Sequence, residues 1–221
     1  MSARKRVGAL ISGRGSNLKA LIAACKDPSF PAEIVTVISN RPAAPGLDFA
    51  RDAGIPALTI DHKAYTSRGE FEVALNRALD GAGVELICNA GFMRLLTAEF
   101  CERWRDRQIN IHPSLLPAFK GLHTHERVLE AGVRISGCTV HFVRTEMDSG
   151  PIIAQAAVPV LAGDTPDSLA ARVLEAEHRL YPHALALVAA GKARVEGERV
   201  VYHHNNGENP GTDDPLIAPK I

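Results

Sequence analysis

The sequence has no long apolar run and no excess of charge of either sign, and each absence excludes a class of protein. No apolar stretch approaches the about 18 residues that a membrane-spanning helix requires, and residues 7–11 are too short for the apolar core of a signal peptide. Lysine plus arginine and aspartate plus glutamate number 25 each, so only a local cluster could attract nucleic acid. The basic cluster Arg4-Lys5-Arg6 is typical of the solvated start of a first strand. We therefore expect no nucleic-acid partner and no membrane partner.

The sequence is also poor in cysteine, and its four cysteines form no motif. Cys25, Cys88, Cys101 and Cys138 are scattered without Cys-x-x-Cys spacing, which argues against a zinc site and against a disulfide framework. Free thiols are the rule in a reducing compartment. The expected location is therefore cytoplasmic, and no metal is expected.

What is present is the composition of an ordinary globular protein. The chain has 221 residues, of which 46% are hydrophobic and 23% are charged. At about 150 residues per domain, this length fits one large α/β unit. No repeat or low-complexity linker divides it, so we expect a single domain over residues 1–203. Residues 204–221 are rich in Asn, Gly, Pro and Asp, which predicts a loosely ordered tail.

Short apolar runs, many of them β-branched, alternate along the chain with segments whose apolar residues fall at helical spacing. We expect strands over residues 7–11, 34–38, 84–88, 109–111, 138–143 and 151–160. We expect helices over residues 18–25, 47–52, 68–80, 98–105, 125–130 and 166–190, and a hairpin over residues 194–203. A strand followed by a helix, repeated, predicts an α/β fold in which helices cover both faces of a mostly parallel sheet.

Three of the expected helices are preceded by side chains that can accept hydrogen bonds from the unpaired amides of a first turn. Ser16 or Asn17 is placed to cap the first helix, and Thr124 is placed to cap the helix at residues 125–130. The strongest signal is Thr165-Pro166-Asp167, which combines an N-cap, a proline in the first turn and an acid near the positive helix end.

The loop Ser12-Gly13-Arg14-Gly15-Ser16-Asn17 joins the first strand to the first helix. Backbone amides and the helix dipole converge there, which favours an anion at the carboxyl end of a parallel strand. The loop lacks the Gly-Lys-Ser/Thr of a P-loop, and Leu18 stands where the third glycine of a dinucleotide fingerprint would fall. The pattern therefore favours a single phosphate, held in part by Ser16 and Asn17. The alternative is a tight turn whose glycines only supply a positive φ.

A second group of polar residues follows two later strands. Asn110 and His112 lie two residues apart, so their side chains share one face of a strand. An amide donor beside an imidazole suits a developing oxyanion and proton transfer near neutral pH. Asp148 lies in a loop after the strand at residues 138–143, from which its carboxylate could reach His112 and hold its tautomer. The alternatives are a hydrogen-bonded strand-end histidine and a turn aspartate.

Five segments together resemble the folate-dependent formyltransferases, in the order and with the spacing of that family. They are Ile11-Ser12-Gly13-x-Gly15-Ser16-Asn17, Ala90-Gly91-Phe92-Met93-Arg94, Asn110-Ile111-His112-Pro113-Ser114-Leu115-Leu116-Pro117, Gly121-Leu122-His123-Thr124-His125 and Asp148-Ser149-Gly150-Pro151. The resemblance covers about residues 6–190 and is specific only when the segments are taken together. It implies the Rossmann-like formyltransferase fold.

The resemblance also implies a reaction. The formyl group of 10-formyltetrahydrofolate, a cosubstrate, would pass to the amine of 5-phosphoribosylglycinamide in purine biosynthesis, through a tetrahedral intermediate and without a metal. Carried over by position, Asn110, His112 and Asp148 are the catalytic residues. Asn110 and His112 would hydrogen-bond the oxyanion, while Asp148 would support His112 and assist proton transfer. The partners are then two small molecules, and a homodimer is compatible with the sequence.

The same resemblance implies two sets of binding residues. Gly15, Ser16 and Asn17 would hold the phosphate of the acceptor, and Glu177 would contact its ribose hydroxyls. The residues implied for the folate are Arg68, Met93, Arg94, Leu95, Leu96, Val143 and Asp148. Leu174 is a departure, because the family often has a polar ribose-contacting side chain at that position.

Glu177 is notable without the resemblance. It lies within an apolar stripe of the last long helix, between Val173, Leu174, Leu180 and Tyr181. Charges are seldom buried without a partner. Either a ligand supplies that partner, or the carboxylate lies at the rim of the stripe in water.

His123 and His125 have a spacing that could suggest a metal site. On a loop that leads into a helix, however, solvent-facing or substrate-loop histidines are more typical. We therefore assign no metal to them.

Three other functions compete with formyl transfer to a small acceptor. Formyltetrahydrofolate hydrolases usually carry an added amino-terminal domain, whereas the first strand here begins near Arg6. Methionyl-tRNA formyltransferases need a carboxyl-terminal nucleic-acid-binding domain, for which about 30 residues and no basic surface remain. A nonenzymatic nucleotide-binding module would not need Asn110, His112 and Asp148 together.

Overall fold

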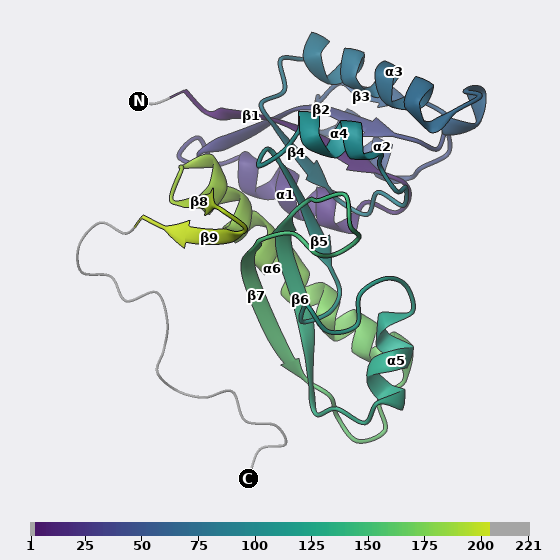
Figure 1. Ribbon diagram of the computed structural model, residues 1–221, viewed down its shortest axis with the longest axis vertical. Coiled ribbons are helices and arrows are strands. Elements are labelled where there is room, and N and C mark those ends of the chain that lie inside the picture. Colours follow the sequence, from purple (N-terminus) through teal and green to yellow (C-terminus); the bar gives the residue numbers. More distant parts are fainter. Residues whose placement is uncertain (1–2, 204–221) are drawn as a thin grey trace.

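The computed structural model describes residues 3–203, which form an α/β fold on a seven-stranded sheet (Figure 1). Its strands lie in the order β3-β2-β1-β4-β5-β6-β7. They are β1 Lys5–Ile11, β2 Ala32–Ser39, β3 Ala57–Thr59, β4 Leu86–Asn89, β5 Gln108–His112, β6 Ile135–Phe142 and β7 Ile152–Pro159. Strands β1 to β5 pair in parallel, and β6 is antiparallel to both of its neighbours. The predicted α/β fold with a mostly parallel sheet is confirmed. The predicted tail at residues 204–221 lies outside the described residues.

Helices cover both faces of the sheet, as predicted. One face packs against α1 Ser16–Cys25, α2 Gly46–Asp52, α5 Thr124–Glu130 and α6 Pro166–Ala189. The other face packs against α3 Arg68–Gly81 and α4 Ala98–Arg103, through Phe71, Leu75 and Phe100. A short 3-10 helix, η1 His62–Ala64, precedes α3. Across residues 3–203, no helix is both long and apolar enough to cross a membrane.

The hairpin predicted near the end of the chain is present. It consists of β8 Ala193–Glu196 and β9 Arg199–Tyr202, which pair antiparallel as a separate two-stranded sheet. The Tyr202 hydroxyl donates to the Ile153 carbonyl, which ties the hairpin to β7. Figure 1 shows the hairpin in yellow beside the carboxyl-terminal end of α6.

Two of the three predicted helix caps are wrong. Ser16 is the first residue of α1, and the N-cap is Gly15, whose φ of 75° only glycine adopts without strain. His123 rather than Thr124 is the N-cap of α5, also without a side-chain cap. Free amides at the start of α1 are thereby left for another partner. The third prediction is confirmed, because the Thr165 side chain accepts from Ser168 N in a capping box.

The chain reverses its direction across the sheet between β1 and β4. From β1 it moves outward to β2 and β3, and it then returns to β4 and continues to β7. Ligands of open α/β sheets bind at such a switch point, beside the carboxyl ends of the strands. Here the loop after β1 and the segment after β4 meet, because Ser12 N donates to Gly91 O at 3.1 Å. This edge holds the residues described next.

Candidate functional site

The loop after β1 is shaped by two glycines in close contact. A Cβ on Gly15 would lie 2.7 Å from the Cα of Gly46, and Gly46 N donates to Gly13 O at 3.0 Å. The start of α2 therefore holds the loop against the start of α1. The amides of Ser16 and Asn17 open α1 without a side-chain cap, so their N–H groups are free to bind an anion. This arrangement agrees with the single phosphate site predicted from the sequence.

Glu177 lies beside this loop and is buried, with 6% of its surface exposed. The Asn17 Nδ2 atom donates to Glu177 Oε2 at 2.7 Å, which joins α1 to α6. The alternative in which the carboxylate reaches water at the rim of the stripe is therefore wrong. Burial raises the pKa of Glu177, and the hydrogen bond from Asn17 lowers it in part. The Oδ1 atom of Asn17 is buried without a partner, so this pair can still accept a hydroxyl donor.

We expect Glu177→Gln to stabilise the ligand-free protein at pH 8 and to leave its stability unchanged at pH 4. The pKa of Glu177 is higher in the folded chain, so ionisation opposes folding above its ordinary pKa. A neutral amide removes this cost and can still accept from Asn17. The expected rise in Tm at pH 8 is about 2–4 °C, which corresponds to 1 kcal/mol in a chain of this size. Calorimetry at both pH values measures it, with the exposed Glu175→Gln as control. Equal Tm values at pH 8 would contradict the prediction.

Ser12 links the loop after β1 to the segment after β4. Its buried hydroxyl accepts from Met93 N at 2.8 Å and donates to Asn40 Oδ1 at 2.5 Å. Met93 and Leu95 are exposed, at 59% and 58%, and the Arg94 Nε atom is buried without a partner. An apolar rim beside a guanidinium whose Nε atom has no partner suits a flat, partly polar ring such as a pterin. Of the other residues predicted for the folate, Leu96 packs into the core behind this rim.

The remaining residues predicted for the folate are Arg68 and Val143. Arg68 is the first residue of α3 and is exposed, so it could meet a carboxylate at the surface. Val143 follows β6 and is half-buried, and its N–H donates to Gln108 O at 2.9 Å. Nothing in the geometry places Arg68 next to the polar residues of β5, so its role rests on the resemblance alone.

The side chains of Asn110 and His112 share one face of β5, as predicted. The alternate residues Ile109 and Ile111 face α6 on the other side of the sheet and pack in the core there. His112 is buried, and its Nε2 atom lies 3.0 Å from the Phe119 carbonyl oxygen. A carbonyl can only accept, so Nε2 carries the proton of this hydrogen bond. The Nδ1 atom is therefore the ring nitrogen that remains available for chemistry.

Asp148 faces that available nitrogen. Its Oδ2 atom lies 3.4 Å from His112 Nδ1 and accepts from Gly121 N at 2.9 Å. The chain reaches this position through a φ of 52° at Asp148, and the side chain is 9% exposed. A carboxylate beside Nδ1 fixes the orientation of the imidazole ring. The predicted meeting of Asp148 and His112 in one crevice is thus seen in the structure.

His141 lies in the candidate site and is absent from the residues predicted from the sequence. It is the cross-strand partner of Asn110, and the Asn110 Nδ2 atom donates to its Nε2 atom at 3.2 Å. Its Nδ1 atom donates to the Phe142 carbonyl at 2.9 Å, and burial lowers its pKa, so the ring is neutral. His141 therefore orients the Asn110 amide. In the sequence, His141 lies within an apolar strand and has the pattern of a core residue. Only the pairing of β5 with β6 shows that it contacts Asn110.

The assembled cluster can stabilise an oxyanion and move a proton. Asn110 supplies an amide donor, and His112 supplies an ionisable nitrogen whose tautomer is set by the backbone. Asp148 supplies the carboxylate. These groups lie on the face of β5 and β6 opposite α6, where the loops at residues 113–123 and 143–150 cover the sheet. A covered site of this kind suits acyl-group transfer.

His123 and His125 lie in different surroundings. His123 is exposed and lies 3.5 Å from Glu126, whereas burial lowers the pKa of His125. Within residues 3–203, no three His, Cys, Asp or Glu side chains are grouped as metal ligands.

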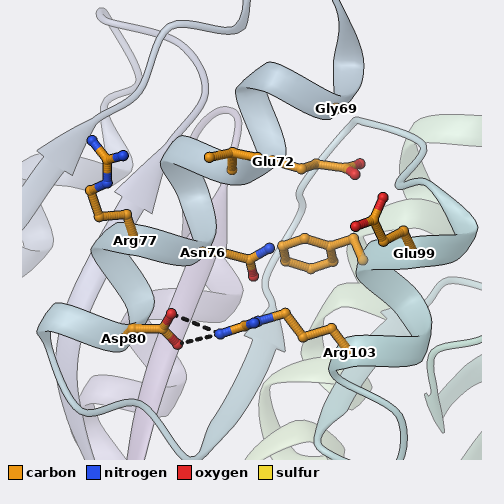
Figure 2. Close-up of a pocket in the computed structure, with 9 residues that line it drawn as sticks. Gly69, Glu72, Asn76, Arg77, Asp80, Glu99 and Arg103 are labelled. Carbon is orange, nitrogen blue, oxygen red and sulfur yellow. Dashed lines mark hydrogen bonds and ion pairs between the residues drawn. The ribbon is translucent and has the colours of Figure 1, made fainter.

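A groove elsewhere on the surface contains none of the predicted site residues. It lies between α3 and α4, and Figure 2 shows Asn76 on its floor and the Asp80–Arg103 ion pair across one end. The Glu72 carboxylate accepts hydrogen bonds from the N–H and from the hydroxyl of Thr97.

Known proteins are similar to most of this chain. A family model described as Formyl transferase matches residues 5–185. The phosphoribosylglycinamide formyltransferase of Escherichia coli is 44% identical over 84% of this chain and 88% of its own length. A trifunctional purine biosynthetic protein adenosine-3 of Gallus gallus is 56% identical over 86% of this chain, which spans only 19% of that protein. The crystal structure of glycinamide ribonucleotide transformylase 1 from Symbiobacterium toebii is 48% identical, with a TM-score of 0.89, over 91% of this chain and 95% of that one.

Proposed function

The chain belongs to the formyl transferase family, and on that premise we propose that it transfers the formyl group of 10-formyltetrahydrofolate to the amine of 5-phosphoribosylglycinamide. It is then an enzyme of purine biosynthesis, with the folate as formyl-donating cosubstrate. The observation that carries the proposal is the contact of His112 with Asp148 on the sheet edge that also holds the phosphate loop. The same proposal places the protein in the cytoplasm, in keeping with four free thiols.

The catalytic step follows from the positions of the polar groups. The substrate amine attacks the formyl carbon, and the carbon–oxygen double bond becomes an oxyanion. The Asn110 amide and the Nδ1–H of protonated His112 hydrogen-bond that oxyanion. Asp148 stabilises the imidazolium and assists transfer of a proton from the attacking nitrogen to the leaving folate nitrogen. The bond to the folate nitrogen then breaks, and the carbonyl reforms on the acceptor.

Binding follows the edge of the sheet. The acceptor phosphate binds the free amides of Ser16 and Asn17, and the Asn17–Glu177 pair receives its ribose hydroxyls. The amine then points across the end of β4 toward His112. The folate ring lies against Met93, Arg94 and Leu95, with Val143 and Asp148 on its other side.

We expect replacement of Ser16 and Asn17 by alanine together to weaken acceptor binding by roughly 10²-fold. The backbone amides remain in this variant, so the loss is that of side-chain hydrogen bonds to the charged phosphate, at about 1.5–3 kcal/mol each. Asn17→Ala also removes the hydrogen bond to buried Glu177 and should lower Tm, whereas Ser16→Ala alone keeps that bond and should change Kd without Tm. Calorimetric titration with the phosphorylated acceptor measures the loss, and the exposed Ser29→Ala is the control. An unchanged Kd in the double variant would reject a role of these two side chains in phosphate binding.

The proposed function is tested by a spectrophotometric assay of 10-formyltetrahydrofolate with and without 5-phosphoribosylglycinamide. We expect release of deformylated folate only when the acceptor is present. Release without the acceptor would replace this proposal with a hydrolase. No release under either condition would favour a different acceptor or a nonenzymatic binding module.

A further inference from the structure

The loop that carries Asp148 is held at its base by an arginine that the proposed reaction does not use. Arg144 is the second residue after β6, and its side chain is 10% exposed. Its Nε atom donates to Glu198 Oε2 at 2.9 Å and its Nη2 atom to Asp106 Oδ1 at 2.8 Å. Its Nη1 atom donates to the Val143 carbonyl at 3.1 Å. The guanidinium is thereby fixed on three sides, as its planar fork allows.

Glu198 comes from the turn of the β8–β9 hairpin, beyond the end of the family match at residue 185. It also pairs with Arg105, which in turn contacts Glu102 at 2.9 Å. The Arg144 guanidinium holds the pKa of Glu198 below its usual range, so this carboxylate is ionised at neutral pH. The hairpin thus contacts the base of the loop through one charged side chain.

The position of the loop tip decides the contact between Asp148 and His112. The His112 Nδ1 to Asp148 Oδ2 distance of 3.4 Å is longer than a normal hydrogen bond, so a small displacement decides whether the pair forms. The loop returns through Gly150, where a Cβ would lie 1.8 Å from the Phe142 carbonyl oxygen. Its tip contacts the facing loop through the Gly121 N–H, which donates to Asp148 Oδ2 at 2.9 Å, and through the exposed Lys120–Glu146 ion pair at 3.2 Å. Such exposed pairs contribute little.

We propose that Arg144 and Glu198 are positioning residues, through which the β8–β9 hairpin braces the 143–150 loop and sets Asp148 against His112. The inference rests on the proposed catalytic role of Asp148. A displacement of about 1 Å in a catalytic group can cost up to about 10²-fold in rate. The brace therefore affects the chemical step and leaves acceptor binding at the phosphate loop unchanged.

The test compares Arg144→Ala, Arg144→Lys and Glu198→Gln with the unaltered chain. We expect Arg144→Ala to lower kcat by about 10-fold or more, within that 10² range, with the acceptor KM unchanged. Glu198→Gln should lower it less, and Arg144→Lys should restore little, because lysine cannot bridge both carboxylates. The matched control is Arg103→Ala, which breaks the Asp80–Arg103 pair on the α3–α4 side (Figure 2) and should leave kcat unchanged.

A second readout needs no substrate. The NMR chemical shifts of the His112 ring report its contact with Asp148, with Asp148→Asn as the reference for a lost pair. We expect these shifts to move toward that reference in Arg144→Ala and in Glu198→Gln. Glu198 is exposed, so its variant should fold even if Arg144→Ala does not. Unchanged kcat and unchanged His112 shifts in Glu198→Gln and in folded Arg144→Ala would overturn the brace. Displaced His112 shifts in a chain without formyl transfer would retain the brace and overturn the proposed function.

Discussion

Asp148→Asn is expected to lower kcat by about 10³-fold while the acceptor still binds. Loss of a general acid–base partner typically costs about 10²–10⁴-fold. The asparagine oxygen can still accept from Gly121 N, so the loop should keep its path. An amide carries no charge, however, and can neither stabilise the imidazolium at Nδ1 nor carry a proton from the attacking amine.

Steady-state kinetics and calorimetric titration with the acceptor separate these two effects. Asp80→Asn is the matched control, because Asp80 pairs with Arg103 in an exposed position on the α3–α4 side. It should leave both kcat and Kd unchanged. Turnover of Asp148→Asn near that of the unaltered chain would remove Asp148 from the mechanism.

His112→Ala should be as severe, with a loss of about 10³-fold in kcat. The substitution removes the Nδ1 donor to the oxyanion and leaves the Asp148 carboxylate without its imidazolium partner. Residues that act as one unit give losses that do not add. The His112→Ala, Asp148→Asn double variant should therefore be little slower than either single variant.

The exposed His183→Ala, on α6, controls for removal of an imidazole and should keep full activity. Acceptor affinity should also be unchanged in His112→Ala, because the phosphate loop and the Asn17–Glu177 pair are not touched. If the two single losses multiply in the double variant, His112 and Asp148 act independently, and their description as one catalytic unit is wrong.

The elements that the sequence predicted best are those with strong local signals. The helix after Thr165 runs to Ala189 despite Pro182, because its cap and its apolar stripe agree. The strand β3 was missed, since only three residues, Ala57–Thr59, pair with β2. A strand so short has no periodicity of its own. The caps at Ser16 and Thr124 were predicted from residue type, whereas left-handed residues at Gly15 and His123 set these starts.

For the site, the sequence could indicate which side chains carry chemistry but not what holds them. Asn110, His112 and Asp148 were identified, and the structure shows His112 in contact with Asp148. The groups that orient them are largely main-chain atoms, the Phe119 carbonyl and the Gly121 amide. Every residue has such atoms, so no residue type reveals them. His141 was missed for a related reason, because its partnership with Asn110 depends on strand register.

That register has a consequence for how the protein acquires activity as it folds. Asn110 lies opposite His141 and His112 lies opposite Thr139, and the Ile111–Val140 pair lies between them on the same antiparallel ladder. A slip of β5 by one residue against β6 would turn Asn110 and His112 toward α6 and place Ile109 and Ile111 on the catalytic face. Misaligned chains would therefore be inactive and would also expose apolar surface to aggregation and proteolysis. During refolding, catalytic competence should appear in one step with the pairing of β5 and β6.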